Sequence, residues 1–360
     1  LSKFVYLSDK NSEEETIQLI EDNGSTTWYD ARENHETRTE FRLYYSSNEA
    51  IKLASERDLL ILGLKPNNDL IIIIAEKDST VEAQIKWLFQ LDEVDAKFTI
   101  RNYEQSDKEL SFSDKRILES IGIEILDTNE NYLEEMLSKY KGDFPDTKTF
   151  SAFARSKSND IDAVNNPDET IIKWFETEDL LFKTLEKHIV SIRLREGFGK
   201  VNPDVDQFIN FSLQVHNRRK SRAGRAFENH LEEIFKLNKI QYSRGKKTEK
   251  NNKPDFIFPG IEHYKESAFN TSLLTMLGVK TTAKDRWRQI LPEANKIWPK
   301  HLITLESPIS VNQTNEMKEQ NVKLVIPQSL IPAYSSNQQK EILNFKTFID
   351  LVIDKQSKIT

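Results

Sequence analysis

The chain has 360 residues, a mass of 42.0 kDa and a formal net charge of −7, with 37% hydrophobic and 30% charged residues and no cysteine. This length favours two domains, the lack of cysteine excludes a disulfide framework, and no apolar run is long enough to span a membrane. Because no secretory signal precedes the first elements, we expect a protein of the cytoplasm.

Charge is distributed unevenly along the chain. Residues 1–160 hold 20 Lys and Arg against 33 Asp and Glu, a net charge of −13, whereas residues 161–360 have a net charge of +6. Phosphate groups are recognised by local basic patches, because charges in solution are screened over about 8 to 10 Å. We therefore look for contacts with anions in the second part.

The first part predicts a strand-rich mixed α/β domain. Alternating or apolar runs predict strands over 3–7, 26–30, 40–46, 58–64 and 69–76, and helical spacing predicts helices over 79–92 and near 130–140. Asn, Ser, Asp and Pro dominate residues 156–169, which is the composition of a linker. We expect one domain over residues 1–155 and a second over 170–360.

The second part predicts helices followed by a layered α/β arrangement. Apolar residues recur at helical spacing from 169 up to Gly197, and another helix covers roughly 203–216. Strand-like runs follow at 254–259, 273–280, 301–307 and 322–327, with a helix over 283–297 between the second and third. Strands that alternate with helices indicate an α/β domain.

Two charged residues stand at the ends of apolar strands, where an unpaired buried charge is costly. Asp255 begins the strand after Pro254, and Lys280 ends the next one. Glu228, beside the apolar stripe of a helix, and Glu293 could join them. Carboxylates that bind Mg²⁺, with a lysine that orients or deprotonates water, suit phosphodiester hydrolysis. The alternative is a structural ion pair between an acid and a lysine.

Further charges crowd the residues after Lys280. They are Lys284, Asp285, Arg286 and Arg288. Arginine suits the major-groove edge of guanine and aspartate can accept from the cytosine amino group, so this stretch could recognise G·C pairs. The alternative is a solvated charged face, since Trp287, Ile290, Leu291, Ala294 and Ile297 form the expected buried stripe of the same helix.

A basic cluster precedes Glu228. Its members are Arg218, Arg219, Lys220, Arg222 and Arg225. Such a cluster near a helix start fits contacts with a DNA backbone. Taken alone, it would more often be a solvated loop.

Residues 170–350 resemble the catalytic domain of the EcoRII-type restriction endonucleases, which have the PD-(D/E)XK nuclease fold. The resemblance rests, in the same order, on "NRRKSRAGRAFENHLEEIF", "KPDFIFP", "MLGVKTTAKDRWRQIL", "HLITLE" and "VKLVIP". It implies a type II endonuclease that cleaves double-stranded DNA at a short CCWGG or CCNGG site with Mg²⁺. A homodimer is expected for a target of this symmetry, with a cognate cytosine methyltransferase as a functional partner without direct contact.

The resemblance also implies catalytic roles for individual residues. Asp255 and Glu293 would ligate the metal, Lys280 would act on the water, and Glu228 would be an additional helical acid. Glu293 would replace the acid that commonly lies beside the lysine. Pro292 precedes it and would kink the predicted helix.

Roles in DNA recognition follow from the same resemblance. Lys284, Asp285 and Arg286 would recognise the outer C·G pairs, and Arg288 with the basic cluster would contact the backbone. Trp174 and Phe175 lie where a residue that stacks on a flipped base is expected, although a core position is the plainer interpretation.

Residues 28–42 resemble the effector-DNA segment of the family's B3-like N-terminal domain. Arg38, Glu40 and Arg42 would be the DNA contacts. The expected fold class is therefore α/β: a mixed α/β B3-like pseudobarrel, complete or truncated, followed by a restriction-endonuclease-like α/β/α domain. A degenerate N-terminal domain with a structural or inhibitory role is the alternative.

Two other functions stay open at this point. A sequence-specific DNA-binding module with a decayed nuclease site would bind DNA without cleaving it in Mg²⁺ or Mn²⁺. A structure-specific repair nuclease would cleave branched or damaged DNA without sequence preference.

Overall fold

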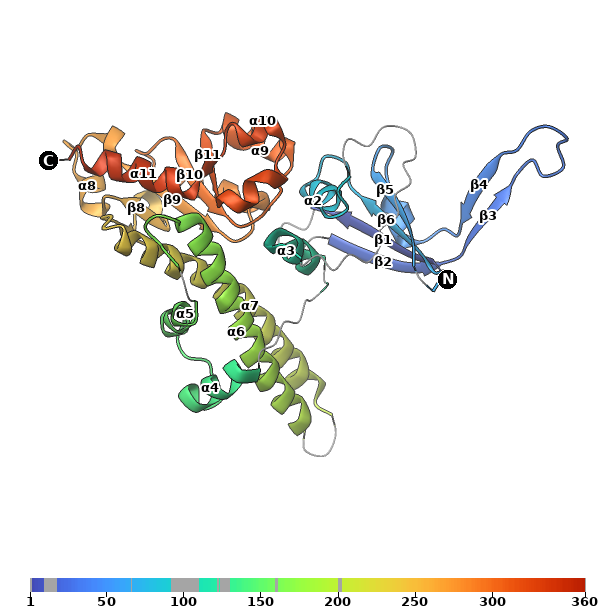
Figure 1. The fold of residues 1–360 in the computed structure, drawn as a ribbon, viewed down its shortest axis with the longest axis horizontal. Helices are drawn as coiled ribbons and strands as arrows, with labels where there is room; N and C mark the ends of the chain where they lie inside the picture. The colour runs from blue at the N-terminus through green and yellow to red at the C-terminus, as the bar shows by residue number, and fades with distance from the viewer. Residues whose placement is uncertain are drawn as a thin grey trace. The chain divides into compact units, whose positions relative to one another are not determined.

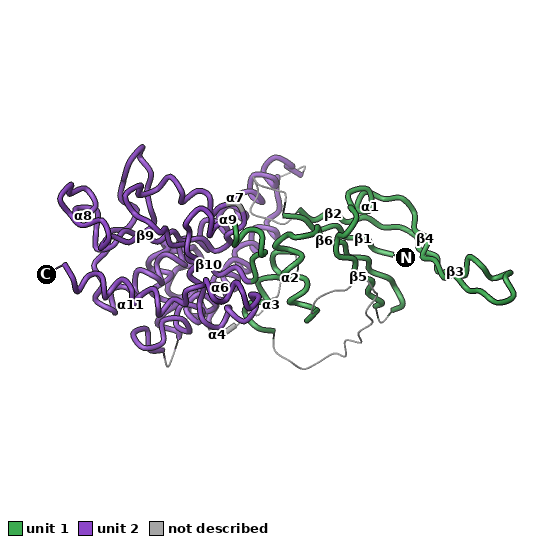
Figure 2. Tube along the Cα trace, turned by 90° about the horizontal axis from the view of Figure 1, so that it is seen from above, with its two compact units in different colours: residues 1–123, 308–315 green, residues 124–307, 316–360 purple. Residues whose placement is uncertain are grey.

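The computed structural model describes residues 2–9, 18–65, 67–91, 110–121, 123, 130–158, 161–199 and 203–359. The chain divides into two compact units (Figure 2). Unit 1 comprises residues 1–123 and 308–315, and unit 2 comprises residues 124–307 and 316–360. This division differs from the expected domain bounds, which stay a prediction.

Unit 1 is built on a four-stranded sheet of order β2-β1-β6-β5. Its strands are β1 (Ser2–Ser8), β2 (Gln18–Gly24), β5 (Leu59–Leu64) and β6 (Leu70–Ala75), and a separate ribbon pairs β3 (Thr26–Asp30) with β4 (Phe41–Tyr45). The helices are α1 (Glu49–Leu53), α2 (Thr80–Leu88) and α3 (Phe112–Ser120). Alternation in β1 places Val5 and Leu7 in one core with α2, and Phe4 and Tyr6 in another with α1.

Four helices open the described part of unit 2. They are α4 (Glu130–Tyr140), α5 (Thr147–Ser156), α6 (Pro167–Glu196) and α7 (Val205–Leu237). The two long helices α6 and α7 run side by side in opposite directions (Figure 1). Pro167 starts α6 at a position where its missing N–H costs nothing. None of the helices in the described residues is both long and apolar enough to cross a membrane.

A six-stranded mixed sheet of order β12-β11-β10-β9-β8-β7 completes unit 2. Its strands are β7 (Ser243–Arg244), β8 (Phe256–Phe258), β9 (Thr275–Lys280), β10 (Lys300–Thr304), β11 (Val322–Ile326) and β12 (Leu343–Asn344). The other helices of unit 2 are α8 (Ile261–Lys265), α10 (Ser336–Gln339) and α11 (Phe345–Gln356), while α9 (Val311–Glu319) begins in unit 1 and ends in unit 2. Phe235 of α7 packs edge-on against Phe256, Phe258 and Phe345, which joins α7 and α11 to the sheet.

The predicted strands and most predicted helices are confirmed, and β2 was missed. The helix expected over 283–297 is wrong. Only a 3-10 helix, Lys284–Ile290, forms there, and irregular turns follow it. Lys284 and Ala294 have positive φ values of 25° and 45°, and Pro292 lacks an N–H, so a continuous α-helix cannot pass through this stretch.

Candidate active site

Asp255 and Lys280 converge because their strands are neighbours. Asp255 lies just before β8, which pairs antiparallel with β9, and Lys280 is the last residue of β9. The Nζ atom of Lys280 is 3.8 Å from Oδ2 of Asp255, and the same oxygen accepts a hydrogen bond of 2.7 Å from the N–H of Val279. Their side chains are 14% and 21% exposed, so both charges are partly shielded from water yet accessible to a ligand.

Glu293 supplies a second carboxyl group with an unused oxygen. Among the side chains that the structure describes, none donates to its buried Oε2. Burial first, and then the negative charge of Asp255, raises the pKa of Glu293 to about 7, while Lys280 and Lys300 oppose the rise. This carboxyl group therefore needs a cation to be ionised at low energetic cost.

The backbone around Glu293 is held by buried donors. Lys300 is fully buried, and its Nζ donates to the carbonyl oxygens of Glu293 and Ala294. Asn252 donates to the carbonyl of Pro292 at 2.7 Å. Pro292 therefore does not kink a helix, because the chain has already left the 3-10 helix when it reaches this residue.

Glu228 is the third carboxylate of the site and already has a partner. Arg244 of β7 donates to Oε2 of Glu228 from Nη2 at 2.8 Å and from Nε at 3.1 Å. The pKa of Glu228 is raised by burial and by Asp255, and Arg244 opposes the rise. Sequence analysis missed Arg244, whose only signal was a cation beside a short strand.

The donor set fits Mg²⁺, a hard cation that favours carboxylate oxygens and keeps several waters. The charge of Asp255 acts on the Glu293 carboxyl group, and the orphaned Oε2 of Glu293 is what a bound cation would satisfy. Within the described ranges, no group of three or more His, Cys, Asp or Glu side chains is arranged to hold a metal. The protein would thus supply two carboxylates, with water and phosphate oxygens completing the coordination.

The residues expected to recognise bases follow directly after β9. Lys284 and Arg286 lie in the 3-10 helix, and the side chain of Asp285 lies outside the described residues. The carboxylate of Glu306 accepts from the N–H groups of Ala283 at 2.5 Å and Lys284 at 3.1 Å. Glu306 thereby holds the start of this segment beside the active site.

We expect Glu306→Ala to lower the free energy of unfolding by about 2 to 4 kcal/mol, because two buried N–H groups lose their acceptor. Glu306→Gln keeps one acceptor oxygen and should cost less. Urea unfolding followed by tryptophan fluorescence measures both, with the exposed Glu341→Ala as the control. Wild-type stability for Glu306→Ala would contradict the positioning role.

The core stripe predicted for this segment is confirmed for Trp287, Ile290, Ala294 and Ile297, which are buried. Ile290 packs over Gly278 of β9. A Cβ atom at position 278 would lie 2.6 Å from Cγ2 of Ile290, so only glycine fits there without a shift. Arg288 is exposed, its guanidinium lies 4.7 Å from the ring centroid of Trp287, and it pairs with Glu316 at 2.5 Å.

The basic cluster lies within α7, and its members have different surroundings. Arg219 pairs with the buried Glu186, and Arg222 donates to the carbonyl of Pro145. The guanidinium of Arg222 lies 4.5 Å from the ring centroid of Phe144, and that of Arg218 lies 5.1 Å from it. These contacts give Arg218, Arg219 and Arg222 structural positions, whereas Lys220 and Arg225 are exposed. Their contacts with a DNA backbone stay a prediction.

Trp174 and Phe175 are core residues of α6. Trp174 packs against His230, and Phe175 meets Phe227 edge to face. Both rings are buried in the core in this structure, as the plainer interpretation expected, and neither is exposed to stack on a flipped base.

Arg38, Glu40 and Arg42 belong to the β3–β4 ribbon and the turn between its strands. Glu40 accepts from Arg32 at 2.6 Å and from Nη2 of Arg42 at 2.6 Å, and these arginines hold its pKa below the usual range. Glu40 is therefore engaged with its neighbours, and the effector-DNA contacts stay a prediction.

Comparison with known proteins finds similarity over the part of the chain that contains these residues. The EcoRII C terminal family model matches residues 182–349, which include Glu228, Asp255, Lys280 and Glu293. The type II restriction enzyme EcoRII of Escherichia coli is 42% identical over 186 residues, covering 51% of this chain and 45% of the relative. SsoII of Shigella sonnei is 28% identical over 203 residues, covering 49% of this chain and 66% of that enzyme.

The chain thus spans about half the length of the first of these relatives. Among solved structures, metal-depleted Ecl18kI in complex with uncleaved DNA has a TM-score of 0.50 at 21% identity, over 64% of this chain and 86% of that one. This likeness shows the fold, that of the PD-(D/E)XK restriction endonucleases. Over residues 182–349, the chain is therefore similar to the EcoRII C terminal family model and to the matching part of EcoRII.

Proposed function

We propose that this chain is a type II restriction endonuclease that hydrolyses double-stranded DNA at a short CCWGG or CCNGG site with Mg²⁺. The observation that carries the proposal is the approach of Lys280 to within 3.8 Å of Asp255 at one sheet edge, with the Glu293 carboxyl group under the electrostatic influence of both, in the segment that matches the family model. The buried Oε2 of Glu293 has no hydrogen-bond donor among the described residues, and a cation held beside Asp255 would satisfy it.

In the proposed reaction, each charged residue of the site has its own role. Asp255 and Glu293 would hold Mg²⁺, which supplies positive charge against the negative charge that builds up on the phosphate. Lys280 orients the attacking water through its ammonium group. The water oxygen forms a bond to phosphorus as the bond to the 3′ oxygen breaks, which leaves a 5′-phosphate and a protonated 3′-hydroxyl. Arg244 pairs with Glu228 and opposes the rise of its pKa that burial and Asp255 cause.

Plasmid cleavage tests this function. A supercoiled plasmid with single CCWGG and CCNGG sites, incubated with Mg²⁺, should be linearised, and sequencing the ends would give the site and the cut position. Binding without cleavage in Mg²⁺ or Mn²⁺ would instead favour the DNA-binding module. Cleavage independent of sequence would favour a repair nuclease.

We expect Arg286→Ala to weaken binding to the specific site by about 10- to 100-fold, which corresponds to the 1 to 3 kcal/mol of one bidentate base contact. Binding to unrelated DNA should change little. Competition gel shifts with specific and unrelated duplexes measure the ratio. Arg288→Ala is the contrast, because loss of a backbone contact weakens binding to all sequences alike. Equal losses on both duplexes for Arg286→Ala would rule out base recognition.

We further propose that two copies of the chain cleave the two strands around the two-fold axis of the target. A cytosine methyltransferase of the same specificity would protect host DNA without touching this chain, and both would act in the cytoplasm. Arg38 and Arg42 on the β3–β4 ribbon would contact a second, effector DNA, a role supported only by the resemblance of residues 28–42.

A further inference from the structure

The loop between β7 and β8, residues 245–255, carries four exposed lysines. They are Lys246, Lys247, Lys250 and Lys253. Among the described residues, no carboxylate lies within ion-pair distance of these four side chains. Clustered lysines without acidic partners create a positive surface that attracts anions. The position and the rigidity of the loop decide which anion it can bind.

The β7–β8 loop lies at the sheet edge that carries the candidate active site. The N–H of Gly245 donates to the carbonyl of Asp255 at 3.0 Å, so both ends of the loop meet at this proposed metal ligand. Lys246 follows Gly245, and Lys253 is two residues from Asp255, which limits the distance between the Cα atoms of Lys253 and Asp255 to about 7 Å. Phosphates of one DNA strand follow one another at about 3.4 Å along the helix axis. A phosphate held at Asp255 therefore brings its neighbours to these lysines.

Backbone hydrogen bonds hold the loop in one shape. The N–H of Thr248 donates to the carbonyl of Asn252 at 2.9 Å, and the N–H of Asn252 donates to the carbonyl of Glu249 at 3.0 Å. Lys250 and Asn251, at the tip, have φ values of 54° and 63°, which are uncommon for residues other than glycine. Backbone contacts thus fix the positions from which the lysine side chains extend.

Side-chain contacts turn the acidic group of the loop inward. Both carboxyl oxygens of Glu249 accept from the hydroxyl group of the buried Tyr264, at 2.6 and 2.7 Å. The side chain of Asn252 donates to the carbonyl of Pro292 at 2.7 Å, which ties the loop to the residue before Glu293. The loop is therefore attached beside both proposed metal ligands, and its exposed charges are those of the lysines.

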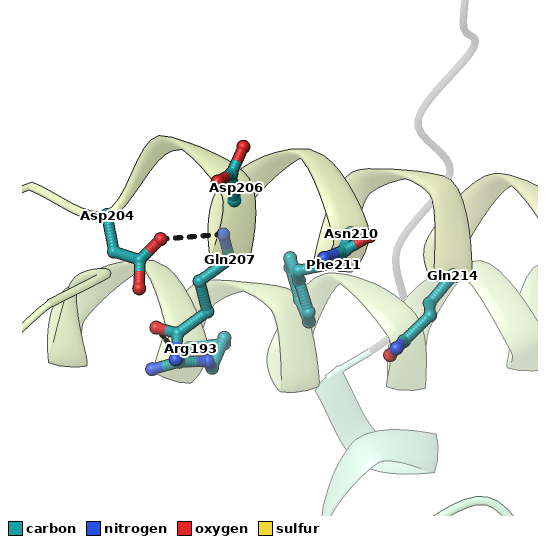
Figure 3. A pocket seen from close by; sticks show the side chains of 7 residues that line it. All are labelled: Arg193, Asp204, Asp206, Gln207, Asn210, Phe211 and Gln214. Carbon is teal, nitrogen blue, oxygen red and sulfur yellow. Dashed lines mark hydrogen bonds between the residues drawn. The ribbon is translucent and has the colours of Figure 1, made fainter.

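A pocket at the start of α7 is a second polar surface, but its charges are unfavourable for phosphate. Arg193 lines it together with Asp204 and Asp206 (Figure 3). The guanidinium of Arg193 already donates to the carbonyl of Gly197 and to the side chain of Gln207, at 2.8 Å each. Two carboxylates beside an engaged arginine repel an anion. This contrast favours the β7–β8 loop as the phosphate site.

We propose that the lysines of the β7–β8 loop bind the DNA phosphates that flank the cleaved one. Lys246 and Lys253, at the two ends of the loop, contact the nearest phosphates, and Lys247 and Lys250 contact phosphates farther along the backbone. The inference rests on the proposed nuclease function, from which it takes the DNA substrate and the place of the cleaved phosphate. A lysine ammonium group binds phosphate as a point charge, so these contacts position the duplex and do not recognise bases.

The salt dependence of binding counts these contacts without any need for cleavage. Fluorescence anisotropy, with chelator in place of Mg²⁺, gives the affinity for a CCWGG duplex and for an unrelated duplex at several KCl concentrations. The slope of log affinity against log salt falls by about 0.9 for each phosphate contact that is lost. Replacing all four loop lysines by alanine should lower the slope by about 3 to 4 on both duplexes alike, because phosphate contacts are independent of sequence.

A control variant removes the same charge at the other end of the strands. β11 is parallel to β9, with β10 between them, so Lys323 near the start of β11 lies away from Lys280 at the end of β9. The control changes are Lys318→Ala, Lys323→Ala, Lys340→Ala and Lys358→Ala. This variant should keep the wild-type slope. A fall of less than about 1 for the loop variant, or an equal fall for the control, would overturn the proposal.

Neutral methylphosphonates then locate a contact on the DNA. Each replaces one phosphate beside the cleaved position of the CCWGG duplex. At the phosphate that Lys253 contacts, the methylphosphonate and Lys253→Ala should each weaken binding by up to about fivefold, and together no more than either alone. Losses that add fully at every position would exclude this contact. Wild-type binding with the expected fall in slope, but without cleavage in Mg²⁺, would refute the nuclease function and leave the loop as a phosphate site.

Discussion

Replacing Lys280 by alanine is expected to lower the rate of DNA cleavage by about 10³-fold, while binding to the specific site persists. The Nζ atom lies 3.8 Å from Asp255, where it can orient water and offset charge in the transition state. Preorganised charge and proton transfer of this kind each contribute about 10² to 10⁴-fold. Lys280 ends β9 and precedes the segment that we propose to recognise bases, so its loss should spare base contacts.

Single-turnover cleavage with Mg²⁺ and gel shifts without metal separate the two effects. Lys323→Ala is the matched control, because Lys323 is a lysine of β11 in the same sheet, separated from β9 by β10, and it pairs with the exposed Glu341. This control should cleave at the wild-type rate. Cleavage at that rate by Lys280→Ala would exclude the catalytic role, and a parallel loss of specific binding would indicate a structural one.

The proximity of Asp255 and Lys280 could be predicted from sequence because it depends on local pattern. Asp255 lies just before one largely apolar strand, and Lys280 is the last residue of the next. Strands that follow one another in sequence are usually neighbours in a sheet. The same reasoning predicted the buried stripe of Trp287 and Ile290. The same reasoning wrongly predicted a regular helix after Lys284, because the positive φ values of this segment are set by the packing of the whole segment.

The supporting residues depend on contacts that no local pattern reveals. Glu306 reaches Ala283 across 23 positions of the chain, and Arg244 reaches Glu228 across 16. The inward direction of Arg222, whose guanidinium packs over aromatic rings, depends on helices α4 to α6 folding around α7. A basic cluster in sequence therefore indicates charge but not which side of the helix carries it.

Glu293 should make the stability of the metal-free protein depend on pH. Its pKa rises from an ordinary 4.5 to about 7 in the folded state, so the folded protein binds more protons than the unfolded chain between these values. The contribution of Glu293 to the free energy of unfolding is fully present below pH 4.5 and is lost as the pH rises through 7. The full loss above this range is about 3 kcal/mol, at 1.36 kcal/mol per pKa unit.

Glu293→Gln should remove this loss, because the amide resembles the protonated acid and never ionises. In urea unfolding with chelator, the advantage of the variant over wild type should grow by about 2 kcal/mol between pH 5.5 and 8.5. Glu319→Gln, at an exposed position on α9, is the control and should gain nothing with pH. Mg²⁺ at pH 8.5 should then stabilise wild type more than Glu293→Gln, since binding to the folded state adds stability. An advantage of the variant that is independent of pH, with equal stabilisation of both proteins by Mg²⁺, would remove Glu293 from the metal site and leave Asp255 as the sole carboxylate in that role.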